Sequence, residues 1–441
     1  MTRSDAPSTQ PGNRLSRRVA VIGAGAAGTM AAIFAASVGA ETLLLEATRD
    51  GGRKILISGG GRCNILPARV DERRFVTDSS PNTLRKMLRA WPLREQIAFF
   101  EGELGLTLVE EQASAKLFPA SNRARDVRDG LLALAARRGA RFFPNTTVIG
   151  IAPAPDGKWQ VERDGASPLR VDAVIVATGG LSVPNTGSDG RGLRMLATLG
   201  HTIHPTYPAL TPVVADSPDL AALAGISLAV TITAEDTTRQ ATATGGFLFT
   251  HRGYSGPSVL DVSHVIARSR LEGGGSARLA VRWTTLDEAG WEAALRPEGT
   301  RTVAGALRRE LPDRLADALA GMAAVPSSRA LAQLGREERR RLIEVLIRGE
   351  LPWTGDEGYR KAEVTGGGVS LAEIDPRTME SRRHPGLFLC GEVLDAFGPI
   401  GGYNFLWAWA TGRAAGIAAA GATSLPRPKP SWPSSSPDSA D

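Results

Sequence analysis

The chain is poor in the residues on which several kinds of redox and metal chemistry depend. Its 441 residues include two cysteines and five histidines. Cys63 and Cys390 lie far apart in the sequence, which argues against a disulfide framework and excludes a Cys-x-x-Cys dithiol centre. The histidines lack metal-ligand spacing, and no HExxH, P-loop or G-x-S-x-G motif is present. Zinc-dependent, nucleotide-hydrolysing and serine-hydrolase mechanisms are therefore disfavoured.

Long apolar runs are missing as well. No uninterrupted run reaches the roughly 18–20 residues that a membrane helix needs, and the polar N-terminus lacks the apolar core of a signal peptide. We therefore expect a cytoplasmic protein with no membrane association. Residues 1–16 and the Pro- and Ser-rich residues 424–441 are predicted to be disordered tails. The net charge of +6 is mild for this length and permits an anionic partner without requiring one.

Glycine, in contrast, is abundant, with 50 residues. The first cluster, Gly23-Ala-Gly25-Ala-Ala-Gly28, directly follows an apolar strand-like segment, residues 19–22. In such a turn the first glycine allows a tight bend, the second lets backbone approach a pyrophosphate, and the third lets helix and strand pack closely. Glu46 ends the next strand-like segment, where a carboxylate can bind ribose hydroxyls. The pattern predicts a dinucleotide site but does not separate FAD from NAD.

A second cluster, GGRKILISGGGRCN at residues 51–64, favours a flavin. Three consecutive glycines imply that backbone lies against something flat or charged. Arg53, Lys54 and Arg62 can meet a phosphate or a flavin carbonyl. NAD dehydrogenases do not usually need such a loop here, whereas a flavoprotein could run its isoalloxazine past it. A flexible surface loop is the alternative.

Two further motifs follow apolar strand-like segments. The first is Ala177-Thr-Gly-Gly180, and the second begins at Gly391-Glu392 and continues to Gly401-Gly-Tyr-Asn404, which opens a helix. Glu392 could bind a ribitol hydroxyl, with Asp395 as its rival. The N–H groups of the helix could point at the flavin C2 carbonyl and N1. The predicted cofactor contacts are Gly23, Gly25, Ala26, Ala27, Gly28, Glu46, Arg53, Lys54, Gly60, Gly61, Arg62, Asn64, Thr178, Gly179, Gly180, Gly391, Glu392, Gly401, Gly402, Tyr403 and Asn404.

The order of these patterns predicts an α/β protein in which a Rossmann-like FAD-binding domain is discontinuous. Its two parts are residues 17–193 and 356–423. Between them, residues 194–286 show short alternating runs separated by turn residues and are predicted to form an inserted antiparallel β domain. Residues 287–355 are predicted to form a helical subdomain of this insertion.

The BaiN/RdsA-type NAD(P)/FAD-dependent oxidoreductases, bacterial flavoproteins also described as aminoacetone-oxidase-like, are the family that this chain resembles. The resemblance covers roughly residues 17–420 and rests on GRKILISGGGRCN, ATGG, TGSDGRG, FLFTHRGYSGPSVLDVS and the long segment from TGGGVSLAEIDPRTMES to GGYNFLWAWATG. It implies FAD, the discontinuous domain with its insertion, and an NAD(P)H-type electron donor. It also implies reduction of C=C bonds in unlike substrates, including steroid acids and a uridine of ribosomal RNA.

Candidates for catalysis come from the insertion and the glycine loop. His251 or Tyr254 could donate a proton and Arg252 could hold an anionic substrate, although an ordinary domain-contact loop is the favoured interpretation. Cys63 could donate a proton or react covalently, although a packed, inert thiol is favoured. No metal is expected. Because a second GxGxxG unit is missing, NAD(P)H would have to visit the cavity that the substrate uses.

Three functions remain open at this point. The leading one is an FAD-dependent oxidoreductase that reduces a C=C bond of a small molecule with NAD(P)H. The second is an rRNA-modifying flavoenzyme of the dihydrouridine synthase kind, favoured by the basic charge and by the Arg-rich segment REERRRLIEVLIRG, residues 336–349. A solvated helix face with internal Glu–Arg pairs also explains that segment. The third is a flavin-binding electron-transfer protein without a substrate of its own.

Overall fold

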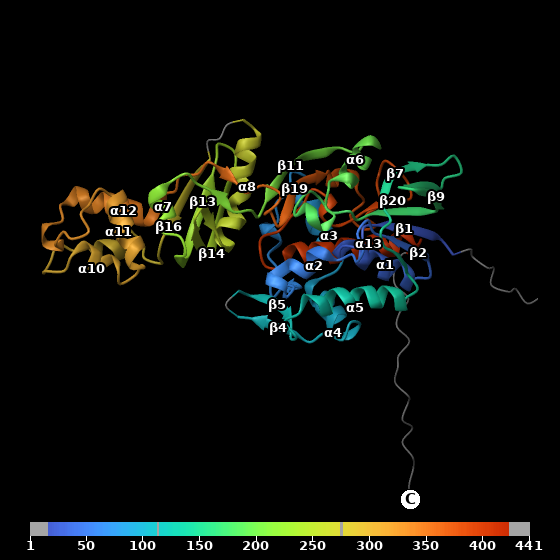
Figure 1. Ribbon diagram of the computed structural model, residues 1–441, viewed down its shortest axis with the longest axis horizontal. Coiled ribbons are helices and arrows are strands. Elements are labelled where there is room, and N and C mark those ends of the chain that lie inside the picture. The colour runs from blue at the N-terminus through green and yellow to red at the C-terminus, as the bar shows by residue number, and fades with distance from the viewer. Residues whose placement is uncertain (1–15, 113, 274–276, 423–441) are drawn as a thin grey trace, which may run out of the picture.

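The computed structural model describes residues 16–112, 114–273 and 277–422. Over these residues the molecule is elongated, with a parallel sheet at one end, an antiparallel sheet in the middle and a group of helices at the other end (Figure 1). The predicted tails, residues 1–16 and 424–441, lie outside the described residues apart from Ser16. None of the helices in the described ranges has the length and apolar character that crossing a bilayer requires.

A five-stranded parallel sheet organises the part of the chain that we call the body, residues 16–209 and 364–422. Its strand order is β20-β10-β1-β2-β6. After their first residues the central strands are apolar or buried throughout, because helices cover both faces of a sheet of this kind. The strands are β1 (Arg18–Ile22), β2 (Glu41–Leu45), β6 (Arg141–Phe143), β10 (Ala173–Val176) and β20 (Leu387–Leu389).

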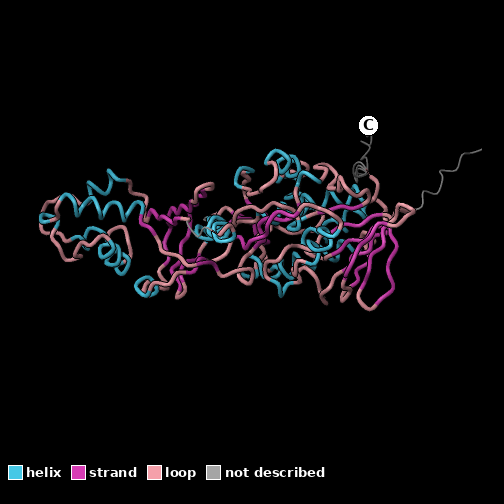
Figure 2. The backbone as a smooth tube through the Cα atoms, turned by 90° about the horizontal axis from the view of Figure 1, so that it is seen from above, coloured by secondary structure: helices cyan, strands magenta, loops and turns pink. Residues whose placement is uncertain are grey.

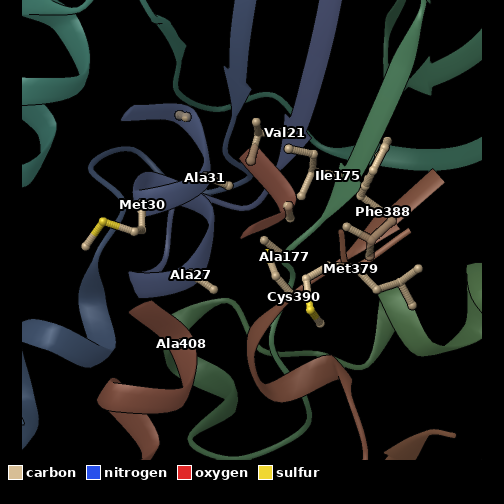
Figure 3. Packing of buried hydrophobic residues seen from close by; sticks show 14 of the residues in the cluster. Val21, Ala27, Met30, Ala31, Ile175, Ala177, Met379, Phe388, Cys390 and Ala408 are labelled. Carbon is tan, nitrogen blue, oxygen red and sulfur yellow. The ribbon is translucent and has the colours of Figure 1, made fainter. Parts of the chain in front are cut away.

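Two helices cross closely beside this sheet, α1 (Ala26–Ser37) and α13 (Tyr403–Ala419). A Cβ added to Gly412 would lie 2.4 Å from the Ala27 carbonyl oxygen, and one added to Gly416 would lie 2.3 Å from that of Ala31. These glycines of α13 therefore let the two backbones approach. Figure 3 shows the small side chains of this packing, with Ala27 and Ala31 on α1 and Ala408 on α13.

Smaller elements complete the body. One antiparallel sheet has the order β3-β5-β4 and another the order β7-β8-β9. Their strands are β3 (Leu66–Pro67), β4 (Leu108–Glu111), β5 (Lys116–Pro119), β7 (Val148–Pro153), β8 (Trp159–Arg163) and β9 (Ala166–Val171). The helices are α2 (Arg53–Ile57), α3 (Pro81–Arg89), α4 (Leu93–Gly102), α5 (Ala124–Arg137), α6 (Arg191–Thr198), η1 (Ser58–Gly61), η2 (Glu72–Arg74), η3 (Pro184–Thr186), η5 (Leu371–Glu373) and η6 (Gly391–Val393).

The chain leaves the body through β11 (Ile203–Ala209) and returns through β19 (Val364–Val369), and these two strands pair antiparallel at the junction (Figure 1). Between them lie the insertion, residues 213–356, and a return segment, residues 357–363. The insertion contains a seven-stranded antiparallel sheet of order β17-β16-β13-β14-β15-β12-β18. Its strands are β12 (Val213–Val214), β13 (Ser227–Glu235), β14 (Gln240–Thr250), β15 (Gly253–Ser255), β16 (Arg278–Arg282), β17 (Gly349–Glu350) and β18 (Gly355–Asp356).

Helices extend from the far end of that sheet, as the view from above also shows (Figure 2). They are α9 (Glu288–Ala294), α10 (Val303–Leu307), α11 (Asp313–Met322), η4 (Leu331–Gln333) and α12 (Arg336–Arg348), and two others, α7 (Pro218–Ala221) and α8 (Pro257–Leu271), pack beside the sheet. The predicted class, a Rossmann-like α/β fold with an antiparallel insertion, is confirmed. The residue boundaries predicted for the domains stay predictions.

One segment of the insertion differs from the sequence-based expectation. The inserted antiparallel β domain predicted for residues 194–286 includes the fifteen-residue helix α8. Its β-branched residues favour a strand, and burial on nearly all sides removes the amphipathic stripe that would identify a helix. Gly256, with a φ of +97°, and Pro257 at the first helical position start the helix instead.

Candidate functional site

A cavity of about 530 Å³ opens at the C-terminal edge of the parallel sheet. Its wall includes residues at or just beyond the C-terminal ends of four strands: Gly23 after β1, Glu46 after β2, Thr178 after β10 and Gly391 after β20. Ligands bind at this edge in open parallel α/β sheets, because the loops and helix N-termini converge there. The cavity is therefore the candidate site.

The first glycine turn is built as the spacing predicts. Gly23 has a φ of +100°, and a Cβ there would lie 2.6 Å from the Ala177 carbonyl oxygen. A Cβ on Gly28 would lie 1.8 Å from the Gly23 carbonyl oxygen, so this glycine allows helix and turn to touch. A Cβ on Gly25 would meet no atom within 4 Å and would project into open space beside the cavity. The turn thus leaves room for a group at the N-terminus of α1.

Glu46 lines the cavity but also holds the turn together. Its Oε2 accepts a hydrogen bond from the Ala24 N–H at 2.7 Å. Its Oε1 accepts bonds from the Thr48 N–H at 2.8 Å and hydroxyl at 2.6 Å. A carboxylate oxygen can accept more than one bond, so these contacts orient Glu46 and leave capacity for a ribose hydroxyl.

Lys54 and Glu392 meet across the cavity wall, although 338 positions separate them. Lys54 Nζ lies 2.5 Å from Glu392 Oε2 and donates to the Ser182 hydroxyl at 2.6 Å. Glu392 Oε1 accepts from the Ser182 hydroxyl at 2.7 Å and the Thr365 N–H at 3.0 Å. Burial raises the pKa of Glu392, but Lys54 and these donors outweigh burial and hold the pKa below its usual value. The carboxylate is therefore ionised and oriented toward the cavity.

Asp395, the rival of Glu392, has a different task. Its side chain is buried, and Oδ2 accepts bonds from the Thr77 hydroxyl at 2.9 Å, the Asp78 N–H at 2.9 Å and the Ser79 N–H at 2.8 Å. These contacts fasten the loop before α3 to the body. Asp395 does not line the cavity, whereas Glu392 does.

The SGGGRCN segment forms helical turns rather than an extended loop. Gly59 and Gly60 adopt left-handed backbone angles within η1, and Gly60 faces the cavity. Arg62 points elsewhere, because it pairs with Glu111 at 3.0 Å and lies over the Phe118 ring at 4.1 Å. Asn64 lines the cavity, and its buried Oδ1 has no hydrogen-bond partner among the described residues.

The start of α13 forms the opposite end of the wall. Gly401 and Gly402 both have a positive φ and line the cavity, and a Cβ on Gly402 would lie 2.5 Å from the backbone of Leu66. Asn404 fixes the preceding turn by exchanging two bonds with the backbone of Gly398, at 2.8 and 3.0 Å. The first N–H groups of α13 lie beside the cavity, where a helix favours partial negative charge.

These features together test whether a flavin dinucleotide suits the cavity. A buried polar atom without a partner is costly unless a ligand satisfies it. Two such atoms, Asn64 Oδ1 and Thr178 Oγ1, belong to residues of the cavity wall. The open space at Gly25 and the N-termini of α1 and α13 suit a pyrophosphate and an electron-rich ring. The donor set and the shape fit FAD.

Most of the predicted cofactor residues meet at this cavity. Five do not line it. Gly28 packs inside the turn, Gly61 lies at the end of η1, Gly180 packs against Thr365, Tyr403 is buried beside Phe75, and Arg62 pairs with Glu111. Those that line it are Gly23, Gly25, Ala26, Ala27, Glu46, Arg53, Lys54, Gly60, Asn64, Thr178, Gly179, Gly391, Glu392, Gly401, Gly402 and Asn404.

The structure does not bring the catalytic candidates to the cavity. Tyr254 is fully buried in the core of the insertion, where its hydroxyl donates to the Pro352 carbonyl at 2.9 Å and burial raises its pKa. His251 and Arg252 are exposed at the β14–β15 turn, and Arg252 pairs with Glu357 at 3.3 Å. Cys63 is buried behind the wall, and burial raises the pKa of its thiol to about 12. In this arrangement none of the four can reach a ligand in the cavity.

Sequence reasoning missed the return segment. Arg360, Lys361, Glu363 and the adjoining Val364 all line the cavity. No glycine pattern precedes them, and a charged stretch between two domains looks like an ordinary linker. Only the pairing of β11 with β19 brings the segment back over the edge of the parallel sheet.

Comparisons with known proteins agree with this geometry. A family model described as the HI0933-like protein Rossmann domain matches residues 17–418. The chain is 32% identical over 406 residues to the ribosomal RNA dihydrouridine synthase of Escherichia coli, covering 89% of this chain and 95% of that protein. It is 31% identical over 414 residues to the 3-dehydro-bile acid delta(4,6)-reductase of Clostridium scindens, covering 91% and 99%. A solved 3-ketosteroid delta1-dehydrogenase from Sterolibacterium denitrificans shares the fold, with a TM-score of 0.51 at 13% identity, covering 92% of this chain and 100% of that chain.

Proposed function

The chain belongs to the HI0933-like family of flavoprotein oxidoreductases, and from this premise we propose that it holds FAD in the cavity and reduces a C=C bond conjugated to a carbonyl group, with NAD(P)H as donor. The family resemblance drawn from the motifs is confirmed. One observation carries the proposal. A single cavity joins the first glycine turn, the Lys54–Glu392 pair and the N-terminus of α13.

Each part of the wall suits one part of the cofactor. Gly23 to Ala27 and the N-terminus of α1 would hold the pyrophosphate, and Glu46 would hold a ribose. Glu392, kept ionised by Lys54, would accept a bond from a ribitol hydroxyl. The N-terminus of α13 would lie beside the pyrimidine end of the ring. When bound, flavin supplies two-electron transfer between a nicotinamide and an acceptor.

The acceptor class follows from what two relatives have in common. A dihydrouridine synthase saturates the C5=C6 bond of a uracil, and the bile-acid enzyme is named for reduction at delta(4,6) next to a 3-oxo group. In both cases the double bond is conjugated to a carbonyl group, which makes its far carbon electrophilic. An electron-transfer protein without a substrate has no support from these relatives, because both are named for defined reactions.

Uridine in ribosomal RNA is the second candidate acceptor, favoured by the 32% identity over nearly the whole length of the E. coli protein. The Arg-rich helix α12 adds little support for ribosomal RNA as the substrate. Arg340 pairs with Glu337, Arg348 with Glu344, and Arg339 with Glu292. Paired arginines of this kind match the solvated face that the sequence also allowed. RNA binding through unpaired arginines would weaken steeply with salt.

Purification tests the cofactor directly. The full-length protein is expected to be yellow and to release FAD on heating. Glu392→Gln removes the charge that Lys54 neutralises and is expected to weaken FAD binding by roughly ten- to a hundredfold, about 1.4–2.8 kcal/mol. Glu111→Gln, which breaks an ion pair outside the cavity, is the matched control and should bind FAD like the wild type. A colourless protein that takes up no added FAD would overturn the proposal.

Turnover tests the acceptor. Under anaerobic conditions the flavin should be reduced by NADH or NADPH and reoxidised by an enone. We would offer a 3-oxo-Δ4-steroid acid in one arm and rRNA lacking dihydrouridine in the other. Mass spectrometry of the product nucleosides or steroids identifies the acceptor. Reoxidation by neither acceptor would contradict the assigned reaction while leaving FAD binding intact.

A further inference from the structure

Two carboxyl groups of the cavity wall, Asp189 and Glu363, are not among the FAD-binding residues, and Asp189 is paired with Arg191 at 3.0 Å. Glu363 ends the return segment directly before β19, where its N–H donates to the Leu210 carbonyl at 3.1 Å and its carbonyl accepts from the Ser182 hydroxyl at 3.3 Å. The backbone is thus held on both sides. Its side chain is open to the cavity and has no hydrogen bond or ion pair within the described residues.

The neighbours of Glu363 show which end of the cavity it occupies. It lies within electrostatic range of Lys116 on β5 and Asp261 on α8. Asp261 Oδ1 accepts a bond from the Ile400 N–H at 2.7 Å, and a Cβ on Gly401 would lie 3.7 Å from Lys116 Cε. Ile400 and Gly401 both line the cavity and lead into α13. Glu363 therefore shares two charged neighbours, Lys116 and Asp261, with the turn that leads into α13.

We propose that Glu363 is the catalytic acid that delivers the proton to the carbon next to the carbonyl group when the C=C bond is reduced; this rests on the function proposed above. The reaction then balances. Reduced flavin, when bound, would supply the far carbon with a hydride, which is two electrons and one proton. The near carbon takes a proton from the Glu363 carboxyl. The carboxylate regains a proton from the water to which the cavity opens, and the substrate gains two electrons and two protons overall.

The electrostatic surroundings keep this carboxyl group protonated to a higher pH than an ordinary glutamate. Glu363 is exposed to the open cavity, and partial desolvation there raises its pKa; Lys116 lowers the pKa and the charge of Asp261 raises it, with a net rise. Asp261 is itself buried, which raises its pKa to about 6 against the opposing effects of the Ile400 N–H, Arg74 and Lys116. An acid works best when its pKa is close to the working pH.

The other charged groups in the wall or directly behind it are committed elsewhere or carry the wrong sign. Glu392 is ionised and paired with Lys54. Asp261 is bound to the Ile400 N–H and to Arg74 at 3.2 Å. Arg360 and Lys361 precede Glu363 on the same segment and line the cavity. As cations they suit a phosphate or an electron-rich oxygen of a ligand, not proton delivery near neutral pH.

The test separates proton delivery from electron transfer. Glu363→Gln, Glu363→Asp and the matched control Glu357→Gln, a glutamate of the return segment outside the cavity, would be reduced anaerobically with NAD(P)H. Reoxidation would then be followed with the enone acceptor and with ferricyanide, which needs no proton on carbon. We expect Glu363→Gln to slow enone reduction by roughly 10²–10⁴-fold, the usual worth of a general acid. Ferricyanide reoxidation should be unchanged, and Glu363→Asp should recover part of the rate.

Two measurements as a function of pH complete the test of Glu363 as the acid. The rate of enone reduction by the wild type should fall as the pH rises through the raised pKa of Glu363. Glu363→Gln should lose that pH dependence. Asp261→Asn should keep it, with the midpoint at a lower pH. In ¹³C-carboxyl-glutamate NMR of the full chain, a resonance absent from Glu363→Gln should titrate above pH 4.5. A Glu363→Gln protein with wild-type enone rate and pH profile would overturn the acid role alone. A wild-type protein that reduces no enone would overturn the proposed reaction and the acid role with it, and the NMR titration would still stand.

Discussion

The body and the insertion each bury an apolar core of their own but use it differently. The insertion has a core of packed rings, in which Phe247, Phe249, Tyr254 and Trp283 lie with centroids 4.8 to 6.0 Å apart. The body instead keeps a cavity of about 530 Å³ at the edge of its sheet. No residue of the insertion lines that cavity among the described residues. The insertion therefore serves the site through its connections, the return segment and the contact of Asp261 with Ile400.

The sharpest contrast between the two regions is in their glycines. Gly28→Ala places a Cβ 1.8 Å from the Gly23 carbonyl oxygen, which forces backbone to move, so we expect a loss of about 4 kcal/mol or more and no bound flavin. Gly321→Ala, on the exposed face of α11, meets no atom within 4 Å and should gain up to about 1 kcal/mol. Urea unfolding and flavin content measure both. Equal stability of the two variants would break the comparison.

We also expect the loss of stability at low pH to come mainly from the body. Glu373 accepts bonds from His201 Nδ1, the Thr202 hydroxyl and Arg383, each at 2.7 Å. Burial raises the pKa of Glu373, but these partners lower it to about 2. Above pH 4.5, the ordinary pKa of a glutamate, the ionised Glu373 stabilises the native state by on the order of 2–3 kcal/mol. This stabilisation is lost as the pH falls from 4.5 to about 2.

Glu373→Gln should flatten the stability profile over that window, as followed by urea unfolding at stepped pH. Glu337→Gln, an exposed residue of α12 in the insertion, is the control and should change the slope far less. If both variants kept the wild-type slope, the low pKa of Glu373 would be contradicted.

A substitution at Tyr254 tests whether this residue only packs in the core of the insertion or takes part in catalysis. Tyr254→Phe keeps the ring in the aromatic core and removes the bond to the Pro352 carbonyl, at a cost of about 1 kcal/mol. Flavin content and enone reduction should match the wild type. Calorimetry and single-turnover kinetics measure the two effects. A hundredfold slower turnover with intact stability would return Tyr254 to the site and require the insertion to move.

The smallest effect is expected at the turn between β14 and β15. Arg252 is 70% exposed and pairs with Glu357 at 3.3 Å, so Arg252→Ala should change stability by less than about 1 kcal/mol. Its side chain lies outside the cavity, and KM for the acceptor should stay the same. A raised KM would show that this turn contacts the substrate after all.

Residue patterns predicted the parts of the site that depend on local backbone geometry. Gly23 and Gly28 have no alternative residue type, because a positive φ or a 1.8 Å overlap excludes any side chain. The positions of Glu392 and of the glycines before α13 could also be predicted, because they follow an apolar strand-like segment closely in the sequence. The helix α8 was missed because nearly complete burial hides helical periodicity. The motif around His251 and Tyr254 did not reveal where these side chains lie: Tyr254 packs in the core of the insertion, and His251 is exposed at a turn outside the cavity.

The sequence alone predicted the first glycine turn, the parallel strands and the family. Each depends on residues that are neighbours in the sequence or on a backbone shape that glycine alone permits. The pairing of Lys54 with Glu392 and the position of Glu363 beside Lys116 and Asp261 came only with the folded molecule. These groups belong to segments that are far apart in the sequence, and they come together because the sheet gathers its strand ends at one edge while β11 and β19 return the chain to it.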